Sequence, residues 1–335
     1  MDCSLPDQTR ISQVHLRTGR LSRALEFYSD VLGLNMAQGP GPTPTHNGTP
    51  TETGLITLTE DQTASPRPPR STGLYHFALR YQTRGDLARV YRRVFSAGYP
   101  VAGASDHGVS EAVYLSDPDG NGVELYVDRP RAQWRWRNGQ IAMVTTPLDL
   151  NNLLDTVTAS PATPQLPAQP ELGHIHLNVA ELAAAERFYA EFLGLAVTQR
   201  TYPGALFFAS GGYHHHIGVN VWAGKTVPPT NSVGLVAYRV EVPVAEILYC
   251  LRHRAPLLGY ETRMEFQEQG SPILQIRDVN GNWLELQASP NAAHTAPRLP
   301  WGGCTEKAAR RARLQTRKTT KQLQTEYKIE YESDH

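Results

Sequence analysis

The sequence contains an internal repeat in which matching residues are separated by a constant offset of 161 positions. A repeat of this kind has to be settled before any other argument about the fold. The pairs at this offset are His15 and His176, Phe27 and Phe188, Gly33 and Gly194, Asp117 and Asp278, and Glu124 and Glu285. Because the register holds from one end of each copy to the other, the chain is best read as a tandem duplication.

Each copy divides again into two modules that begin with a strand and continue with a helix and further strands. In the first module, an alternating strand at residues 13–18 precedes apolar residues at helical spacing, and Gly33 is a helix stop. In the second module, a strand at residues 74–79 precedes an amphipathic helix. A Pro- and Gly-containing turn at residues 117–120 then leads into a strand at residues 123–127. The second copy repeats this order, so we predict four modules.

The composition shifts define where the copies begin and end. The predicted segments are an N-terminal domain at 10–136, a Pro-rich linker at 137–171, a C-terminal domain at 172–289 and a tail at 290–335. The tail is rich in Lys and Arg and poor in apolar residues, which predicts a disordered segment.

The bulk composition excludes several classes of protein. The 335 residues have a formal net charge of zero and 40% are hydrophobic, so neither nucleic acid nor a membrane surface is expected as the main partner. No apolar run approaches the roughly 18 residues of a membrane helix. The three cysteines are scattered, which indicates neither a disulfide framework nor a zinc site and fits a reducing compartment. We therefore predict a cytoplasmic protein; a homo-oligomer is left open.

Strand alternation predicts which side chains share an open face. With Ile175 and Leu177 packed inward, His174 and His176 face outward. In the second module, the same reasoning packs Tyr75, Phe77 and Leu79 and leaves His76 open. Glu124 joins His76 because its neighbours Val123 and Leu125 belong to the packed set.

The run of three histidines at residues 214–216 precedes the alternating residues Ile217, Val219 and Val221. If the strand includes the run, His214 and His216 face the open side and His215 lies behind it. Alternation therefore favours His216 over His215 as a cavity residue.

Several motifs resemble a known family. Phe-Tyr-x-x-x-Leu-Gly-Leu at residues 27–34, and Asp-Pro-Asp-Gly-Asn before the strand that bears Glu124, resemble the vicinal oxygen chelate superfamily of glyoxalases, extradiol dioxygenases and antibiotic-resistance proteins. More closely, residues 73–78, 106–122 and 211–218 resemble the Bacillus-type catechol 2,3-dioxygenase-like subfamily. The similarity spans about residues 10–289.

The resemblance implies an α+β fold of four βαβββ modules, paired into two eight-stranded cup-like barrels. It also implies a divalent metal held by His on a first strand and Glu on a last strand. The matching first-strand positions are Gln13, His76, His174 and Ala237, and the last-strand positions are Thr57 or Thr59, Glu124, Asn220 and Glu285. Modules two and three together offer His76, His174 and Glu124 as metal ligands.

Two assemblies are open at this point. If module two pairs with module three, the complete set of ligands falls in one cup and the other cup is vestigial. If modules pair within each half, His76 joins Glu124 in one cup and His174 joins Glu285 in the other. Each cup would then need a further ligand such as His216.

Two His and one carboxylate are typical of non-haem Fe(II) sites that bind substrate and O₂ together. The resemblance therefore implies an extradiol ring-cleavage dioxygenase acting on catechol or a related small aromatic diol, with Fe(II) expected and Mn(II) as the alternative metal. His216 and His107 are the candidates for proton transfer. The alternatives are a glyoxalase-type metal-dependent isomerase or lyase, and a metal-free small-molecule binding protein of the resistance type.

Overall fold

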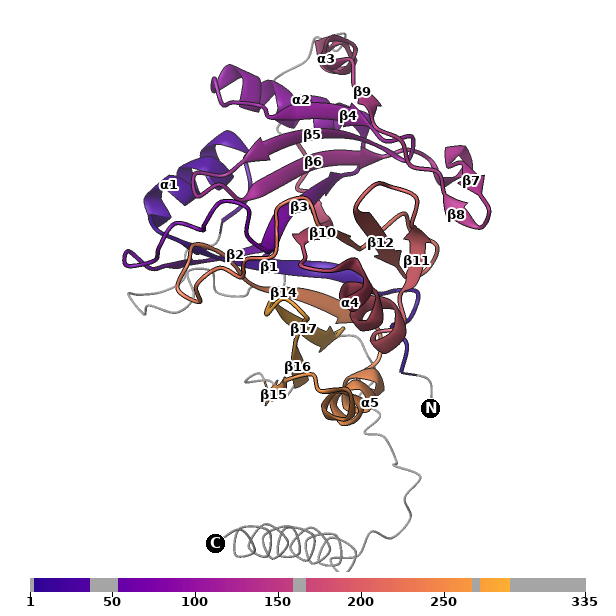
Figure 1. Ribbon diagram of the computed structural model, residues 1–335. Coiled ribbons are helices and arrows are strands. Elements are labelled where there is room, and N and C mark those ends of the chain that lie inside the picture. Colours follow the sequence, from indigo (N-terminus) through magenta and orange to yellow (C-terminus); the bar gives the residue numbers. More distant parts are fainter. Residues whose placement is uncertain (1–2, 37–53, 159–166, 267–271, 290–335) are drawn as a thin grey trace, which may run out of the picture. The chain divides into compact units, whose positions relative to one another are not determined.

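Two mixed β-sheets form the framework of the protein (Figure 1). The computed structural model describes residues 3–36, 54–158, 167–266 and 272–289. The six-stranded sheet has the order β15 (Thr262–Phe266), β16 (Pro272–Arg277), β17 (Trp283–Ala288), β14 (Gly234–Val242), β1 (Arg10–Thr18) and β2 (Ile56–Glu60). The nine-stranded sheet has the order β11 (Ala196–Gln199), β12 (Ala205–Ala209), β13 (Ile217–Asn220), β10 (Glu171–Asn178), β3 (Gly73–Tyr81), β6 (Gly122–Asp128), β5 (Ser110–Ser116), β4 (Gly103–Asp106) and β9 (Thr146–Pro147).

Four of the five described α-helices lie between the strands of the modules, and α3 lies in the segment between the two copies. The five helices are α1 (Leu21–Leu25), α2 (Arg84–Ser96), α3 (Leu150–Thr158), α4 (Leu182–Glu186) and α5 (Glu246–Arg254). Helices α1 and α4 each continue into a π-helical turn, at Glu26–Val31 and Arg187–Phe192. Two 3₁₀ turns lie at Arg131–Gln133 and Ala255–Leu258, and β7 (Trp136–Arg137) pairs with β8 (Gln140–Ile141). None of the described helices is long and apolar enough to span a bilayer.

Each sheet combines modules from both halves of the chain. The first strands β10 and β3 pair antiparallel, which joins modules three and two, and β1 pairs with β14, which joins modules one and four. The predicted α+β fold with paired modules is confirmed, and pairing within each half is wrong. The strand counts differ from eight in part because β9, from the segment predicted as a linker, extends the larger sheet. Residues 37–53 and the basic tail lie outside the described residues.

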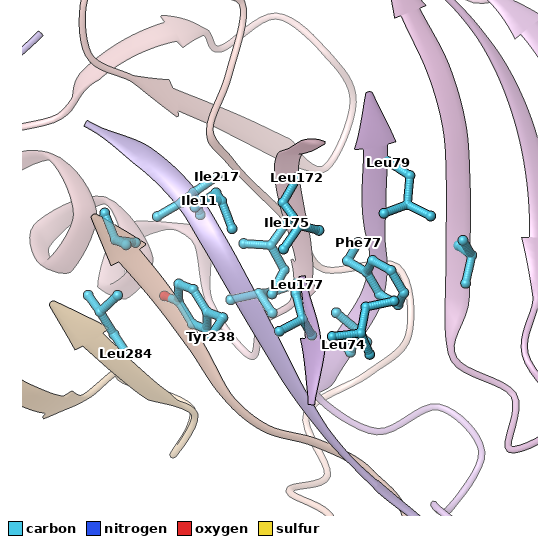
Figure 2. Close-up of a cluster of buried hydrophobic side chains, with 14 of the residues drawn as sticks. Ile11, Leu74, Phe77, Leu79, Leu172, Ile175, Leu177, Ile217, Tyr238 and Leu284 are labelled. Atoms are coloured by element: carbon cyan, nitrogen blue, oxygen red, sulfur yellow. The ribbon is translucent and has the colours of Figure 1, made fainter. Parts of the chain in front are cut away.

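The core consists of apolar side chains from the inner faces of both sheets. Figure 2 shows Ile175 and Leu177 of β10 and Phe77 of β3 close to Tyr238 of β14 and Ile11 of β1. All five side chains are nearly inaccessible to solvent. Burial of each such side chain contributes on the order of 1.5–3 kcal/mol, so this core fixes the faces on which the remaining polar residues are left.

The same hydrogen bond recurs in both halves between a helix of one module and a turn of the next. The hydroxyl of Tyr28 donates to Asp117 at 2.8 Å, and that of Tyr189 donates to Asp278 at 2.9 Å. Asp117 also accepts hydrogen bonds from the backbone and side chain of Asn121. Because this turn leads directly into β6, the bond helps to hold the strand that carries Glu124.

Two β-bulges interrupt the pairing of β10 with β3. Gly173 is an extra residue on β10 between Leu172 and His174, and Tyr75 is an extra residue on β3 between Leu74 and His76. A bulge breaks the alternation of side chains. Tyr75 is accordingly 43% exposed instead of packed with Phe77, so its predicted inward orientation is wrong. The pairing of β1 with β14 has matching bulges, which are at the equivalent positions of the repeat.

The expectation that the cysteines form no disulfide is wrong for one pair. Cys3 and Cys250 are bonded across a sequence separation of 247 residues, with their Cα atoms 5.7 Å apart. Sequence spacing does not reveal such a pair because only the folded chain brings the N-terminal segment to α5. The scattered cysteines therefore do not support the prediction of a reducing compartment.

Gly173 leads to a first prediction. A Cβ added here would overlap the hydroxyl of Tyr126 and lie 2.5 Å from its Cζ. We expect Gly173→Ala to destabilise the protein by about 1–3 kcal/mol through overpacking, with a lower midpoint in thermal unfolding followed by circular dichroism. Gly19→Ala is the control, since its Cβ would meet no atom closer than 3.7 Å. Equal unfolding midpoints for the two variants would contradict this interpretation.

Candidate metal centre

Three adjacent strands bring the predicted ligands together. His76 lies on β3, Glu124 on β6 and His174 on β10, and all three side chains are buried. Oε2 of Glu124 is 2.9 Å from Nε2 of His76 and 3.0 Å from Nε2 of His174. The two imidazole Nε2 atoms are 3.3 Å apart. One carboxylate oxygen and two imidazole nitrogens therefore converge on one point.

These distances fit a divalent metal ion. Nitrogen and oxygen ligands at roughly 2.1 Å from an ion, set at right angles to one another, are roughly 3 Å apart. The three atoms would then occupy one face of the ion, as two His and one carboxylate do in non-haem Fe(II) sites with open positions. Among the described residues, this is the one group of three or more His, Cys, Asp or Glu whose ligand atoms converge in this way.

The protonation states also suit a metal. Burial would raise the pKa of Glu124, but the charges and hydrogen bonds of His174 and His76 outweigh it and hold that pKa well below its ordinary value. Burial lowers the pKa of His174 to about 4, against the opposing effect of Glu124. The site therefore contains an ionised carboxylate and, at His174, a neutral imidazole, which is the form that binds metals.

His174 is held by ring packing. In the described part of the chain, no group forms a hydrogen bond with its buried Nδ1. Its ring instead packs against His215, with centroids 4.1 Å apart, and against Tyr126 at 5.0 Å. The bulge at Gly173 gives Tyr126 the space for this contact. The orientation of His174 thus depends on the rings around it.

A cavity of about 560 Å³ opens in front of His76 and Glu124. Its volume falls within the range typical of small-molecule sites. Aromatic side chains form much of the wall, and they are Tyr75, Tyr202, Phe207 and Trp222. The polar side chains near the triad include His107, Tyr114 and His215.

His107, which the sequence analysis named as a candidate for proton transfer, lines this cavity. Its Nδ1 is 2.8 Å from the carbonyl oxygen of Val144, so this nitrogen carries the proton. Its Nε2 then accepts a hydrogen bond from the hydroxyl of Tyr114 at 2.6 Å. Burial and the nearby charge of Glu124 raise the pKa of Tyr114 well above its ordinary value. Tyr114 is therefore a neutral phenol between His107 and the carboxylate of Glu124.

The cavity position predicted for His216 is wrong. Strand β13 begins at Ile217, so alternation does not extend through the three histidines. His215 lines the cavity, whereas Nδ1 of His216 accepts a hydrogen bond from the backbone of Ser210 and its ring packs on Tyr213. Burial lowers the pKa of His216 to about 3.

His215 is oriented by a chain of hydrogen bonds that the sequence did not reveal. Oδ1 of Asp128 accepts from Nε2 of His214 at 2.9 Å, so Nδ1 of His214 is an acceptor. That atom is 2.8 Å from Nδ1 of His215, which is therefore the donor. Nε2 of His215 is then the unprotonated nitrogen of this ring. Side chains two residues apart on a strand share a face, so Asp128 lies on the same face of β6 as Glu124. This alternation could have identified Asp128 from the sequence.

In the six-stranded sheet, the positions equivalent to His76, His174 and Glu124 do not form a group of metal ligands. The guanidinium of Arg239 donates to Oε2 of Glu285 at 3.0 and 2.7 Å. Gln13, which corresponds to His174, donates to the carbonyl of Gly54 at 3.1 Å. Ala237 corresponds to His76 and has no ligand atom. Arg239 thus neutralises Glu285, whose counterpart in the nine-stranded sheet is the candidate ligand Glu124.

The chain belongs to the glyoxalase/bleomycin resistance protein/dioxygenase superfamily, whose family model matches residues 10–125 and 171–286. The predicted resemblance is thereby confirmed. The chain is 41% identical over 276 residues to catechol-2,3-dioxygenase of Bacillus subtilis (strain 168), covering 79% of this chain and 94% of that protein. It is 31% identical over 121 residues to biphenyl-2,3-diol 1,2-dioxygenase 3 of Rhodococcus globerulus, covering 36% of this chain and 63% of the other.

The fold is similar to that of solved structures. A candidate dioxygenase of Bacillus subtilis subsp. subtilis str. 168 has a TM-score of 0.60 at 13% identity, covering 86% of each chain. Glyoxalase I from Zea mays has a TM-score of 0.54 at 16% identity, covering 84% of this chain and 92% of that one. At these identities the structures show the shared fold only.

The geometry predicts which substitutions abolish metal binding. We expect His76→Ala, His174→Ala and Glu124→Ala to reduce bound metal from one ion per chain to a small fraction, measured by inductively coupled plasma mass spectrometry after Fe(II) loading. His253→Ala, at an exposed site on α5, is the control.

The variant Glu285→Ala tests whether the ion binds in the nine-stranded or in the six-stranded sheet. Because Glu285 is bound by Arg239, we expect its substitution to leave the metal content at one ion per chain. Loss of metal in this variant, or full metal content in Glu124→Ala, would show that the ion binds elsewhere.

Proposed function

We propose that this protein is an extradiol ring-cleavage dioxygenase that uses one divalent metal, with Fe(II) expected, to open catechol or a related ortho-diphenol with O₂. The observation that carries the proposal is the convergence of His76, His174 and Glu124 beside an aromatic-walled cavity. The identity to the Bacillus subtilis catechol-2,3-dioxygenase supports the substrate class. In this proposal the three side chains bind the metal.

A divalent metal bound by the triad would supply Lewis acidity to the substrate hydroxyls and open positions for both the diol and O₂. The protein supplies the surroundings. Tyr75, Phe207 and Trp222 provide apolar surface against which an aromatic ring can lie. These rings also limit the access of water to the reacting groups.

Proton transfer is assigned to His215 in place of His216. The unprotonated Nε2 of His215 accepts the proton of one substrate hydroxyl, since its Nδ1 is engaged with His214. Burial lowers the pKa of His215 well below its ordinary value, so the ring is neutral when substrate arrives. His107 orients Tyr114, whose hydroxyl lies beside Glu124, and so acts as a positioning residue.

The overall reaction balances without another reactant. Both atoms of O₂ enter the product, one ring carbon–carbon bond beside a hydroxyl breaks, and the diol supplies the electrons. The product is a hydroxymuconic semialdehyde. An isomerase on this fold would consume no oxygen, and a metal-free binding protein would leave the diol unchanged.

Oxygen uptake tests the proposal directly. We expect the anaerobically Fe(II)-loaded protein to consume one O₂ for each catechol and to form a yellow ring-fission product, followed with an oxygen electrode and by absorbance. Protein loaded with Zn(II) is the control, because this ion has no redox chemistry. If catechol, 3-methylcatechol and dihydroxybiphenyl all fail to drive oxygen uptake, the dioxygenase assignment is wrong.

A pair of adjacent histidines tests the proton-transfer assignment. His215→Gln should lower kcat per bound metal ion by roughly 100-fold or more, since general acid–base groups contribute about 10²–10⁴-fold. His216→Gln should lower kcat far less, because this ring is directed at Ser210 and Tyr213. Stopped-flow measurement of single turnovers provides the comparison. A larger loss in His216→Gln would return the assignment to that residue.

A further inference from the structure

One positively charged side chain in the cavity wall has no acidic partner. Arg67 belongs to the connector between β2 and β3, and it is the one Lys or Arg among the described residues that line the cavity. Its Nη1 donates to the carbonyl oxygen of Leu74. Within the described ranges of the chain, no carboxylate oxygen lies within 4.0 Å of its guanidinium.

Some other partly buried arginines of the protein have carboxylate partners, whereas Arg93 and Arg254 donate to backbone carbonyls. Arg80 contacts Asp128 and Glu171, and Arg239 contacts Glu285. For Arg67, burial lowers the pKa below its ordinary value, and the more distant charge of Asp117 opposes this only in part. The protein therefore keeps a partly desolvated guanidinium without a directly paired acid, an arrangement that favours an anionic ligand.

Asp117 does not serve as that partner. One of its oxygens accepts from the hydroxyl of Tyr28 and the side-chain amide of Asn121, and the other accepts from backbone amides. These bonds commit the carboxylate to its own turn. Within the part of the chain that the structure describes, the N–H groups of Arg67 other than the one bound to Leu74 are thus available to a bound molecule.

The location of Arg67 relates it to the proposed metal centre. The carbonyl that it binds, at Leu74, is two residues from His76 on the same strand. Gly122, which pairs with His76 across β3 and β6, lines the same cavity as Arg67. A diol bound at the triad would therefore share its cavity with Arg67. The volume of about 560 Å³ is more than a bare catechol ring requires, so a ring substituent has room.

We propose that Arg67 binds a carboxylate on the ring substituent of the substrate, so that the preferred substrates are acidic catechols. This inference rests on the proposed dioxygenase function. A guanidinium presents two parallel N–H donors that match the two oxygens of a carboxylate. The pairing would select acidic diols from neutral ones and turn the reacting ring in a fixed direction relative to the triad.

Three catechols of matched size test the proposal. They are 3,4-dihydroxyphenylacetate, which is anionic, 4-ethylcatechol, which is neutral, and 3,4-dihydroxyphenethylamine, which is cationic. We expect kcat/KM for the acid to exceed that for the neutral compound by roughly 10-fold or more, the size of one charge-assisted hydrogen-bonded pair, and that for the amine to be lowest. Anaerobic calorimetry of the metal-loaded protein should give dissociation constants in the same order.

Variants at position 67 test whether the charge of Arg67 causes the preference for the acidic catechol. Arg67→Gln should reduce the ratio of acid to neutral kcat/KM to about one, and Arg67→Lys should retain part of it. Arg70→Gln is the control, because this arginine is on the same connector but is exposed and does not line the cavity. Metal content and the thermal midpoint of each variant establish that it is folded.

Two results would overturn the proposal. One is a wild-type protein that does not prefer the acid in either measurement, and the other is an Arg67→Gln variant that keeps the wild-type preference. If none of the three catechols drives oxygen uptake, the dioxygenase function fails. The calorimetric affinities of wild type and Arg67→Gln then still decide whether Arg67 binds the acid.

Discussion

The antiparallel pairing of β10 with β3 is the interaction on which the candidate site depends. Each strand carries one imidazole of the triad, and the two strands come from different halves of the duplicated chain. Parallel pairing of β3 with β6 then adds Glu124 to the same face. Neither half contains the whole triad, so the site exists only when the two copies join through their first strands. The pairing that builds the larger sheet therefore also brings the three candidate ligands together.

The two bulges in this pairing change the orientation of side chains around the candidate site. At Tyr75 the extra residue turns an aromatic ring toward the cavity beside His76, where strict alternation would have packed it inside. At Gly173 the extra residue leaves room for Tyr126 to press against the ring of His174. The two bulges recur at the equivalent positions of the other sheet, where the extra residues are Ser12 and Val236.

The sequence predicted the parts of the site that depend on strand position. Strand alternation placed His76, His174 and Glu124 on the open face, and the resemblance to the family selected these three from the other polar residues of that face as metal ligands. His215 was missed since the strand starts at Ile217, three residues later than a strand that includes His214. The Cys3–Cys250 bond and the hydrogen-bond chain from Asp128 depend on contacts between distant segments, which no local pattern encodes.

The two sheets show alternative ways to satisfy the same buried acid. A carboxylate removed from water needs a positive partner. In the larger sheet Ala78 stands where Arg239 stands in the smaller one, and its short side chain leaves the space beside Glu124 open to an ion. In the smaller sheet the guanidinium fills that space and holds Glu285. Three exchanges thus separate the two sheets: the smaller sheet has Arg239 in place of Ala78, Gln13 in place of His174 and Ala237 in place of His76, so its carboxylate has an arginine partner and lacks both imidazoles.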